Sequence, residues 1–214
     1  MTGGVACSRA QGLLWATRQQ DSLRQSIPCG GAFISAGYSE VILPSIWGQS
    51  PFVEKAGEGI LSQMYAFGDK AGRPICLIPE ATAIIREMYK SGWDRSMPKP
   101  IRMFYVARCY RYERPQSGRY REFTQFGVEL LGGFSPDDKE EAMRVLRLLL
   151  DASGVAYNLV PSVKRGLDYY TEDGFEAECP CLDAQKQVAG GGRYDCGVGF
   201  AVGVDRLLLA KARR

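Results

Sequence analysis

The chain has 214 residues, of which 45% are apolar and 24% charged. These values lie in the ordinary globular range and exclude a disordered or fibrous protein. The formal net charge of +3 argues against a strongly basic protein that wraps nucleic acid, although it leaves room for local arginine sites. The sequence contains no histidine, which excludes histidine-based triads, histidine metal ligands and imidazole acid–base catalysis. Any chemistry must therefore rest on carboxylates, arginines, tyrosines, cysteines, backbone groups or the substrate itself.

The seven cysteines are scattered along the chain, and the only close pair is Cys179 and Cys181. This odd number and spacing favour reduced thiols in a cytoplasmic protein over a disulfide framework or a zinc site, so we expect no metal held by a protein cage. The first 24 residues contain only short apolar pieces and three arginines, which is typical of neither a signal peptide nor a membrane span. We therefore expect a cytoplasmic location and no membrane partner.

The first half of the chain is predicted to alternate short helices and strands. In chain order we expect a helix (9–26), a short strand ending before a proline (38–43), a polar glycine-bearing connection (50–62), two strands around a hairpin-type loop (64–67 and 75–77) and a helix (79–89).

The second half carries the stronger patterns, including two long aromatic and β-branched runs. We expect an antiparallel hairpin (101–113 and 123–131, with a polar loop 114–122), an amphipathic helix (136–152), three strands (155–160, 174–179 and 186–189), a strand or turn (200–202) and a final helix (203–212). Mostly antiparallel strands flanked by helices predict an α+β fold, and no linker or repeat divides the chain, so residues 1–214 are interpreted as a single domain.

The predicted hairpin places polar side chains on one face. Arg111 and Glu113 share a face of its first strand, while Gln125 and Glu129 share a face of the second with Phe123. If the two sets lie on the same side they form a compact polar group, with Gly127 leaving open space among them. A solvated sheet face with cross-strand ion pairs is the alternative. The glycine gap and the basic loop favour a pocket, because such a group would be costly in a core.

Two further segments point to a ligand. The loop 114–122 holds three arginines, which can bind phosphate oxygens with fork geometry, although a solvated charged turn is the alternative. The glycines at 190–192 do not match the spacing of a dinucleotide-binding fingerprint or a P-loop. They indicate a backbone that turns sharply or approaches another group closely. Arg206, near the start of an apolar helix, is a cation that a core does not require.

These segments together resemble the catalytic core of the class II aminoacyl-tRNA synthetases, in the histidyl form. The matching segments are 37–44 (motif 1), 64–69 and 77–82 (ammonium binding), 110–129 (motif 2), 165–171 (the Arg-Gly-Leu-Asp-Tyr-Tyr signature of histidyl enzymes), and 190–195 with 203–206 (a second signature and motif 3). The resemblance implies an antiparallel sheet flanked by helices and a homodimer formed through the strand at 38–44.

The resemblance also implies ATP-binding roles. Arg111 is expected to contact the α-phosphate and the amino-acid carboxylate, and Glu113 to accept a hydrogen bond from the adenine amino group. Phe123 would stack on adenine, with Arg206 on its other face. Arg119 and Arg206 would hold the γ-phosphate, and Mg²⁺ would accompany ATP.

The remaining roles concern the amino acid. By resemblance, Arg165 and Arg111 are the catalytic residues, since both would stabilise charge at the α-phosphate. Glu129 and Tyr170 would bracket the imidazole of a histidine substrate. The full set of amino-acid-binding residues implied is Glu80, Thr82, Gln125, Glu129, Tyr169, Tyr170, Gly190 and Gly191.

The implied activity is ATP-dependent formation of histidyl-adenylate, with transfer to the acceptor end of tRNA or to another acceptor. Ile78, Ala81 and Thr124 depart from the family pattern, and the 36 positions between Glu129 and Arg165 leave no room for the insertion domain usual in the family. A C-terminal anticodon-binding domain is likewise expected to be absent. Two alternatives are a non-catalytic paralogue that binds histidine or regulates a partner, and an inactive fragment of a longer enzyme. A non-catalytic paralogue is expected to have lost the ATP-binding arginines.

Overall fold

A computed structural model describes residues 30–56, 58–163, 174–183 and 185–213. Their helical elements are α2 (Gly30–Ser35), α3 (Ser50–Ala56), a 3₁₀ helix (Glu58–Gln63), α4 (Thr82–Met88), a π-helical turn (Tyr89–Trp93), α5 (Asp94–Ser96), α6 (Pro136–Ser153) and α7 (Val204–Ala212). Their strands are β1 (Ser39–Glu40), β2 (Ile46–Gly48), β3 (Ala66–Gly68), β4 (Pro74–Leu77), β5 (Ile101–Tyr110), β6 (Glu122–Leu131), β7 (Asn158–Val163), β8 (Gly174–Glu178), β9 (Gln187–Tyr194) and β10 (Gly197–Gly203).

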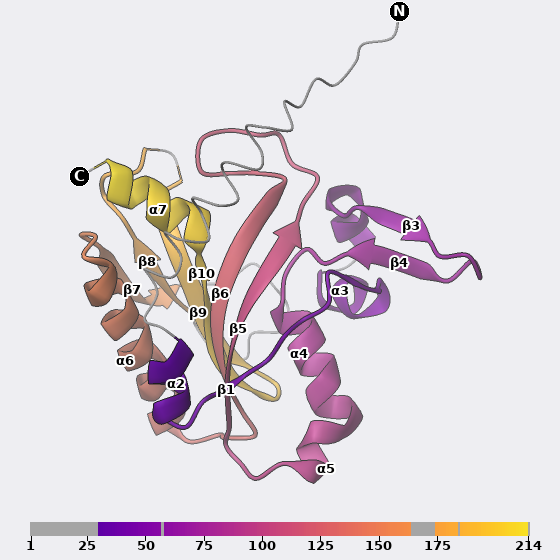
Figure 1. Cartoon of the computed structure of the whole chain (residues 1–214), viewed down its shortest axis with the longest axis horizontal. Coiled ribbons are helices and arrows are strands. Elements are labelled where there is room, and N and C mark those ends of the chain that lie inside the picture. The colour runs from indigo at the N-terminus through magenta and orange to yellow at the C-terminus, as the bar shows by residue number, and fades with distance from the viewer. Residues whose placement is uncertain (1–29, 57, 164–173, 184, 214) are drawn as a thin grey trace, which may run out of the picture.

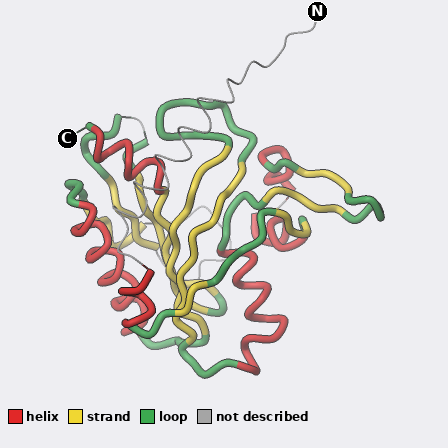
Figure 2. Tube along the Cα trace, viewed as in Figure 1, coloured by secondary structure: helices red, strands yellow, loops and turns green. Residues whose placement is uncertain are grey.

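A seven-stranded sheet forms the centre of the molecule, in the order β1-β5-β6-β10-β9-β8-β7. Every neighbouring pair is antiparallel except β1 with β5, which is parallel. A small sheet, β2-β4-β3, lies beside it, and its β3–β4 hairpin projects to the right in Figure 1. A mixed structure dominated by an antiparallel sheet with helices on both sides confirms the predicted α+β class (Figure 2).

Two apolar clusters cover the two faces of the large sheet. One joins Phe104, Phe126 and Val128 of the central strands to α2, α6 and α7. The other joins Met103 and Tyr105 of the same strands to α4 and the small sheet. Successive side chains on β5 therefore enter different clusters, as strand alternation requires. Figure 1 shows α6 and α7 on one side of the sheet and α4 on the other.

The hairpin of β5 and β6 confirms the strongest prediction. Its register pairs Tyr110 with Glu122 and Ile101 with Leu131, so the two strands match along their whole length. The first strand ends at Tyr110 rather than at the predicted residue 113. The reason is local hydrogen bonding: the Tyr112 amide donates to Gln63 O at 2.8 Å, which turns the backbone away from the ladder.

The long helix α6 begins where its local sequence predicts. Ser135 lies at the N-cap, its hydroxyl accepts from the Asp137 amide at 3.2 Å, and Asp138 accepts from the Ser135 amide at 3.0 Å. This reciprocal arrangement is a capping box, and Pro136 at the first helical position fits it because that position needs no amide donor. Gly154 in the left-handed conformation, with φ of +66°, ends the helix.

Several sequence-based predictions differ from the structure. The polar connection at 50–62 is in fact helical, since α3 and the 3₁₀ helix occupy most of it. Phe52 is 1% exposed and packs with α4, so tertiary contact stabilises a helix that the polar composition concealed. The strand predicted at 38–43 is a ladder of only two residues. The helix predicted at 9–26 lies outside the described residues.

The glycine-rich C-terminal segment forms two long strands rather than a turn. β9 extends from Gln187 to Tyr194 and includes all three glycines, and β10 pairs with it through a tight connection at Asp195 and Cys196. Asp195 accepts from Arg86 and Lys90 on the α4 side, each at 2.6 Å. Those two cations lower the pKa of Asp195 to about 2. The hairpin is thus tied to the helical layer that faces it.

Candidate active site

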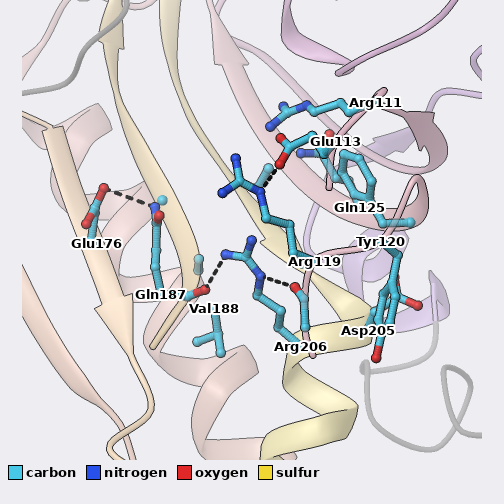
Figure 3. Close-up of a pocket in the computed structure, with 16 residues that line it drawn as sticks. Arg111, Glu113, Arg119, Tyr120, Gln125, Glu176, Gln187, Val188, Asp205 and Arg206 are labelled. Atoms are coloured by element: carbon cyan, nitrogen blue, oxygen red, sulfur yellow. Dashed lines mark hydrogen bonds and ion pairs between the residues drawn. The ribbon is translucent and has the colours of Figure 1, made fainter. Parts of the chain in front are cut away.

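A cavity of about 410 Å³ lies on the face of the sheet toward α4, near the loop end of the β5–β6 hairpin (Figure 3). Its size is within the range of small-molecule sites. It is lined by residues of β6, β8, β9, β10 and α7, together with the loop between β5 and β6. The predicted site residues that line it are Arg111, Glu113, Arg119, Phe123, Gln125, Gly190 and Arg206.

Arg111 lies over the ring of Phe123, and this contact confirms the predicted shared face. Its guanidinium carbon is 5.2 Å from the ring centroid, a cation–π distance. Its Nε donates to the carbonyl of Pro79 at 2.9 Å. The Arg111 amide donates to Arg121 O at 2.8 Å, which continues the hairpin by one pair beyond the strands. The guanidinium is therefore held from two sides with its terminal nitrogens directed to the cavity, as Figure 3 shows.

Arg119 and Arg206 occupy the other side of the cavity (Figure 3). Arg119 forms an ion pair with the carboxylate of Glu113. Arg206 donates to two backbone carbonyls, Gly118 O at 2.6 Å and Gln187 O at 2.9 Å. Burial first, and then the positive charges of Arg111 and Arg119, lower the pKa of Arg206. An arginine starts so far above neutral pH that it stays protonated, so the cavity gathers three cations and suits a polyanionic ligand.

Glu129 lies deeper along the same strand and is only 1% exposed. Its Oε1 accepts from the Thr82 hydroxyl at 3.1 Å, and its Oε2 accepts from the Tyr194 hydroxyl at 2.7 Å. The opposing residue on β10 is Gly199, where an added Cβ would overlap Oε2 of Glu129. The buried Glu129 carboxylate therefore packs against the backbone of Gly199 and is surrounded by hydroxyl donors.

Gly127 does not leave the open space that the sequence predicted. A Cβ at this position would overlap the phenol ring of Tyr105, which packs over the glycine from the neighbouring strand. The prediction was wrong because a strand pattern shows which face a side chain takes but not how far a large neighbour reaches. Tyr105 is fully buried, and burial with the nearby carboxylates of Glu129 and Glu80 raises its pKa well above the ordinary value.

The other predicted amino-acid-binding residues lie close to Glu129 or behind the cavity. Glu80 accepts from the amides of Thr82 at 3.2 Å and Ala83 at 2.9 Å, so its carboxylate caps the first turn of α4. Gly190 lines the cavity. Gly191 belongs to the opposite face, where an added Cβ would meet Gly199 O, Phe175 and Phe200. Arg165, Tyr169 and Tyr170 lie outside the described residues.

The structure adds residues that sequence reasoning did not assign. Glu176, Gln187 and Asp205 line the cavity, and Gln187 donates to Glu176 at 3.0 Å. Asp205 accepts from the Thr124 amide at 2.7 Å and so fixes the start of α7 against β6. Tyr194 donates a hydrogen bond to Glu129, although no role was predicted for this residue from the sequence. The available signal was that Tyr194 and Gly190 share one period-2 face of the same strand.

Two kinds of feature are absent from the described residues, a metal-binding cluster and a membrane-spanning helix. No group of three or more acidic or cysteine side chains there is arranged to hold a metal ion. No helix among these residues is both long and apolar enough to cross a membrane.

The family model described as "Histidyl-tRNA synthetase" matches residues 16–160, more than half of the chain. The histidine–tRNA ligase of Archaeoglobus fulgidus is 32% identical over 281 aligned positions, which include 82% of this chain and 68% of the relative. That of Methanosarcina acetivorans is 31% identical, with coverage of 80% and 67%. Because 281 positions exceed the whole chain of 214, the first relative contains residues inside the aligned region that have no counterpart here.

Solved structures give the same result. The histidyl-tRNA synthetase of S. aureus has a TM-score of 0.70 and 25% identity, over 99% of this chain and 69% of that one. An ATP phosphoribosyltransferase regulatory subunit/histidyl-tRNA synthetase from Bacillus halodurans has a TM-score of 0.73 at 16% identity, over 92% and 80%. The second likeness shows the shared fold alone. With a class II synthetase fold, a matching family model and relatives above 30% identity, the chain belongs to the histidyl-tRNA synthetase family.

Proposed function

We propose that the chain activates histidine with ATP to form histidyl-adenylate and pyrophosphate. The observation that carries the proposal is the cavity in which Arg111, Arg119 and Arg206 converge beside the buried carboxylate pocket of Glu129. Three guanidinium groups suit a triphosphate, because arginine binds phosphate oxygens with paired donors and stays charged. The family membership established above supports the same reaction.

This reaction needs no histidine side chain in the protein. The attacking group is the carboxylate of the amino acid, which is already ionised at neutral pH, so no general base is required. Positioning and neutralisation of the charge at the α-phosphate are the main requirements. Arg111 is suited to this role because Pro79 O and the Phe123 ring fix its guanidinium. Arg165 has the corresponding role by resemblance.

Mg²⁺ is proposed to enter with ATP rather than to reside in the protein. A magnesium ion carried by phosphates usually keeps several waters and needs one or two carboxylates from the protein. Glu176 lines the cavity and is an oxygen donor of the kind that this ion prefers. When bound, the ion neutralises phosphate charge alongside the arginines.

Glu129 is proposed to select histidine among the amino acids. Its carboxylate is 1% exposed and accepts hydrogen bonds from Thr82 and Tyr194. An amino acid without a ring N–H would lie against this buried carboxylate without donating a hydrogen bond to it. Sites built around a buried polar group reject such analogues strongly.

ATP–pyrophosphate exchange across the twenty amino acids tests the proposal. We expect exchange with histidine and its loss in Arg111→Ala and Arg165→Ala. Arg108→Ala is a matched control, since Arg108 lies near the end of β5, shortly before Arg111, but pairs with Glu122 on the surface. Absence of histidine-dependent exchange in the unmodified chain would rule the proposal out.

The acceptor of the activated histidine is proposed to be the acceptor end of tRNA. The relatives in the comparisons carry the name histidine–tRNA ligase, which supports this acceptor. Acylation of histidine tRNA by the chain tests it. Exchange without acylation of that tRNA would point to another acceptor.

A regulatory role without catalysis is the second candidate, because the fold is shared with a Bacillus halodurans protein described as an ATP phosphoribosyltransferase regulatory subunit/histidyl-tRNA synthetase. Such a role does not require the three cavity arginines, whereas this chain retains them all. Calorimetry with ATP and Mg²⁺ distinguishes the two. Histidine binding without ATP binding would favour the regulatory role.

We also propose a cytoplasmic homodimer formed through the segment at β1. Beyond this two-residue strand Ile42 is 88% exposed, and Ile46 and Val106 are about half exposed. Large apolar side chains that are exposed to this extent are typical of a surface that a partner covers. Light scattering of the purified chain measures its mass and tests the proposal.

A further inference from the structure

The ion pair between Glu113 and Arg119 connects two parts of the cavity that the proposed function assigns to different parts of ATP. Glu113 is expected to bind the adenine amino group, and Arg119 the γ-phosphate. In the structure the two side chains bind each other (Figure 3). A relation between the two ends rests on the proposed ATP site and concerns how binding at one end changes the affinity of the other.

Both partners are held in place by the backbone around them. The Glu113 amide donates to Arg111 O at 2.9 Å, and the carboxylate is only 11% exposed. Arg119 lies in a tight turn in which the amides and carbonyls of Gln116 and Arg119 bond to each other, at 3.1 and 2.9 Å. Arg206 holds the same turn through Gly118 O. The ion pair is therefore a contact between two fixed segments and not between two freely moving side chains.

Each ligand fragment binds only one residue of the ion pair. An adenine amino group needs the carboxylate oxygens of Glu113, and a terminal phosphate needs the guanidinium of Arg119. Because Glu113 is largely covered, its oxygens cannot simply turn toward solvent to serve both. The pair joins Nε of Arg119 to Oε2 of Glu113 and neutralises part of each charge, so either fragment interacts fully with its residue only when the pair is broken.

We propose that the Glu113–Arg119 ion pair is an internal competitor that couples the adenine and triphosphate ends of the cavity, so that binding at one end releases the residue needed at the other. The fragment that binds first must break the pair, and its binding free energy is reduced by that cost. The second fragment then binds to a residue that is already released. The two fragments must consequently bind with positive cooperativity, and the coupling must be the same in both directions.

The size of the coupling follows from the exposure of the pair. Arg119 is 43% exposed, so water screens the interaction from one side. Pairs of this kind change an equilibrium by up to about fivefold. Intact ATP, which carries both fragments, breaks the pair and replaces it with two contacts.

Calorimetry with adenosine and inorganic tripolyphosphate tests the proposal on the full chain. The central variant is Arg119→Gln, which removes the ion pair and the phosphate contact together. It is expected to weaken ATP and tripolyphosphate binding while it tightens adenosine binding by up to about fivefold. A gain in affinity for one fragment on loss of an ATP-binding arginine is not expected of a residue that only binds phosphate.

Arg121→Gln is the matched control. Arg121 lies in the same loop and donates to the backbone carbonyl of Glu113 at 3.0 Å, with its guanidinium 4.3 Å from the Tyr112 ring, but it makes no ion pair with the Glu113 carboxylate. This variant should leave adenosine affinity unchanged. Saturating tripolyphosphate should tighten adenosine binding in the unmodified chain and in Arg121→Gln, and have no such effect in Arg119→Gln.

Adenosine affinity that Arg119→Gln leaves unchanged or lowers would overturn the coupling, as would independent binding of the two fragments to the unmodified chain. These results are distinct from failure of the ATP site itself. If the unmodified chain binds no ATP, the proposed function fails as well. If it binds ATP and Arg119→Gln weakens that binding without any change for adenosine, the ATP site stands and only the coupling fails.

Discussion

Gly199→Ala tests whether the buried carboxylate of Glu129 depends on a missing side chain opposite it. An added Cβ at Gly199 would overlap Glu129 Oε2 and lie 2.5 Å from both Glu129 Cδ and Val128 O. The glutamate could move only by giving up its hydrogen bond from Tyr194. Val128 O belongs to the backbone of the paired strand and cannot rotate away.

The magnitude follows from these two conflicts. Overpacking a filled site costs about 1–3 kcal/mol, since backbone and side chains must shift. Loss of a hydrogen bond to a charged acceptor costs about 1.5–3 kcal/mol more. We therefore expect Gly199→Ala to lower the free energy of unfolding by ~3–5 kcal/mol, a large part of the stability of an ordinary domain.

Urea unfolding of the unmodified chain, Gly199→Ala and Gly203→Ala measures the effect. Gly203 ends the same strand, but the atom nearest to its added Cβ is 3.7 Å away, an ordinary contact. Its replacement should change stability by less than about 1 kcal/mol and can raise it, because alanine restricts the unfolded chain. If Gly199→Ala unfolds at the same urea concentration as Gly203→Ala, then the packing of Glu129 over Gly199 does not hold. In histidine-dependent exchange, Gly199→Ala should also raise the KM for histidine more than that for ATP.

Three further predictions concern separate parts of the molecule. Tyr194→Phe removes the hydroxyl that donates to Glu129 and should destabilise the chain by about 1–3 kcal/mol in urea unfolding; an unchanged midpoint would contradict the hydrogen bond. Asp195 has its pKa lowered to about 2 by two cations, so its stabilisation is complete above pH ~5 and falls as the pH drops toward 2. Asp195→Asn should therefore cost on the order of 1 kcal/mol at pH 7, reduced by partial exposure, and almost nothing near pH 2, as pH-dependent unfolding measures. Ile42→Lys should convert the proposed dimer to monomers in light scattering, whereas Leu148→Lys, on an exposed position of α6, should not.

The sequence predicted those parts of the fold in which local pattern and tertiary packing agree. The β5–β6 hairpin is the clearest case, since alternation along two strands fixes both their faces and their pairing. Helix α6 is another, because its proline and its amphipathic stripe are local features. The same patterns were sufficient to place Arg111 and Gln125 on one face beside the loop.

The missed elements depend on contacts that no local pattern encodes. Residues Ser50–Ala56 look like a polar connection, yet Phe52 anchors them in the cluster beneath α4. The glycines at 190–192 look like a turn, yet all three lie within strand β9. The alternative of a close backbone approach was correct at Gly191, where an added Cβ would overlap Gly199 O.

Gly127 shows the limit of the same reasoning within the site. The strand face of Gly127 was predicted correctly, but the space above it is filled by the ring of Tyr105 from the paired strand. No motif in the sequence singled out Tyr105. A glycine beside polar groups is thus ambiguous in sequence, since it can admit a ligand or a neighbouring aromatic ring. Only the register between β5 and β6, which sets Tyr105 against Gly127, distinguishes the two.

Burial along β6 gives a physical reason for the proposed order of substrate groups. Near its start, Phe123 and Gln125 line the open cavity, where partly exposed arginines can meet a hydrated, multiply charged phosphate chain. Six residues further on, Glu129 lies in the core, where an unmatched polar contact is most costly. Phosphates require charge neutralisation but little discrimination, whereas an amino-acid side chain must be told apart from nineteen others. Strand β6 runs from the open cavity into the core and so supplies both conditions. Replacement of the single carboxylate at its buried end, as in Glu129→Gln, should therefore alter the choice of amino acid more than the affinity for ATP.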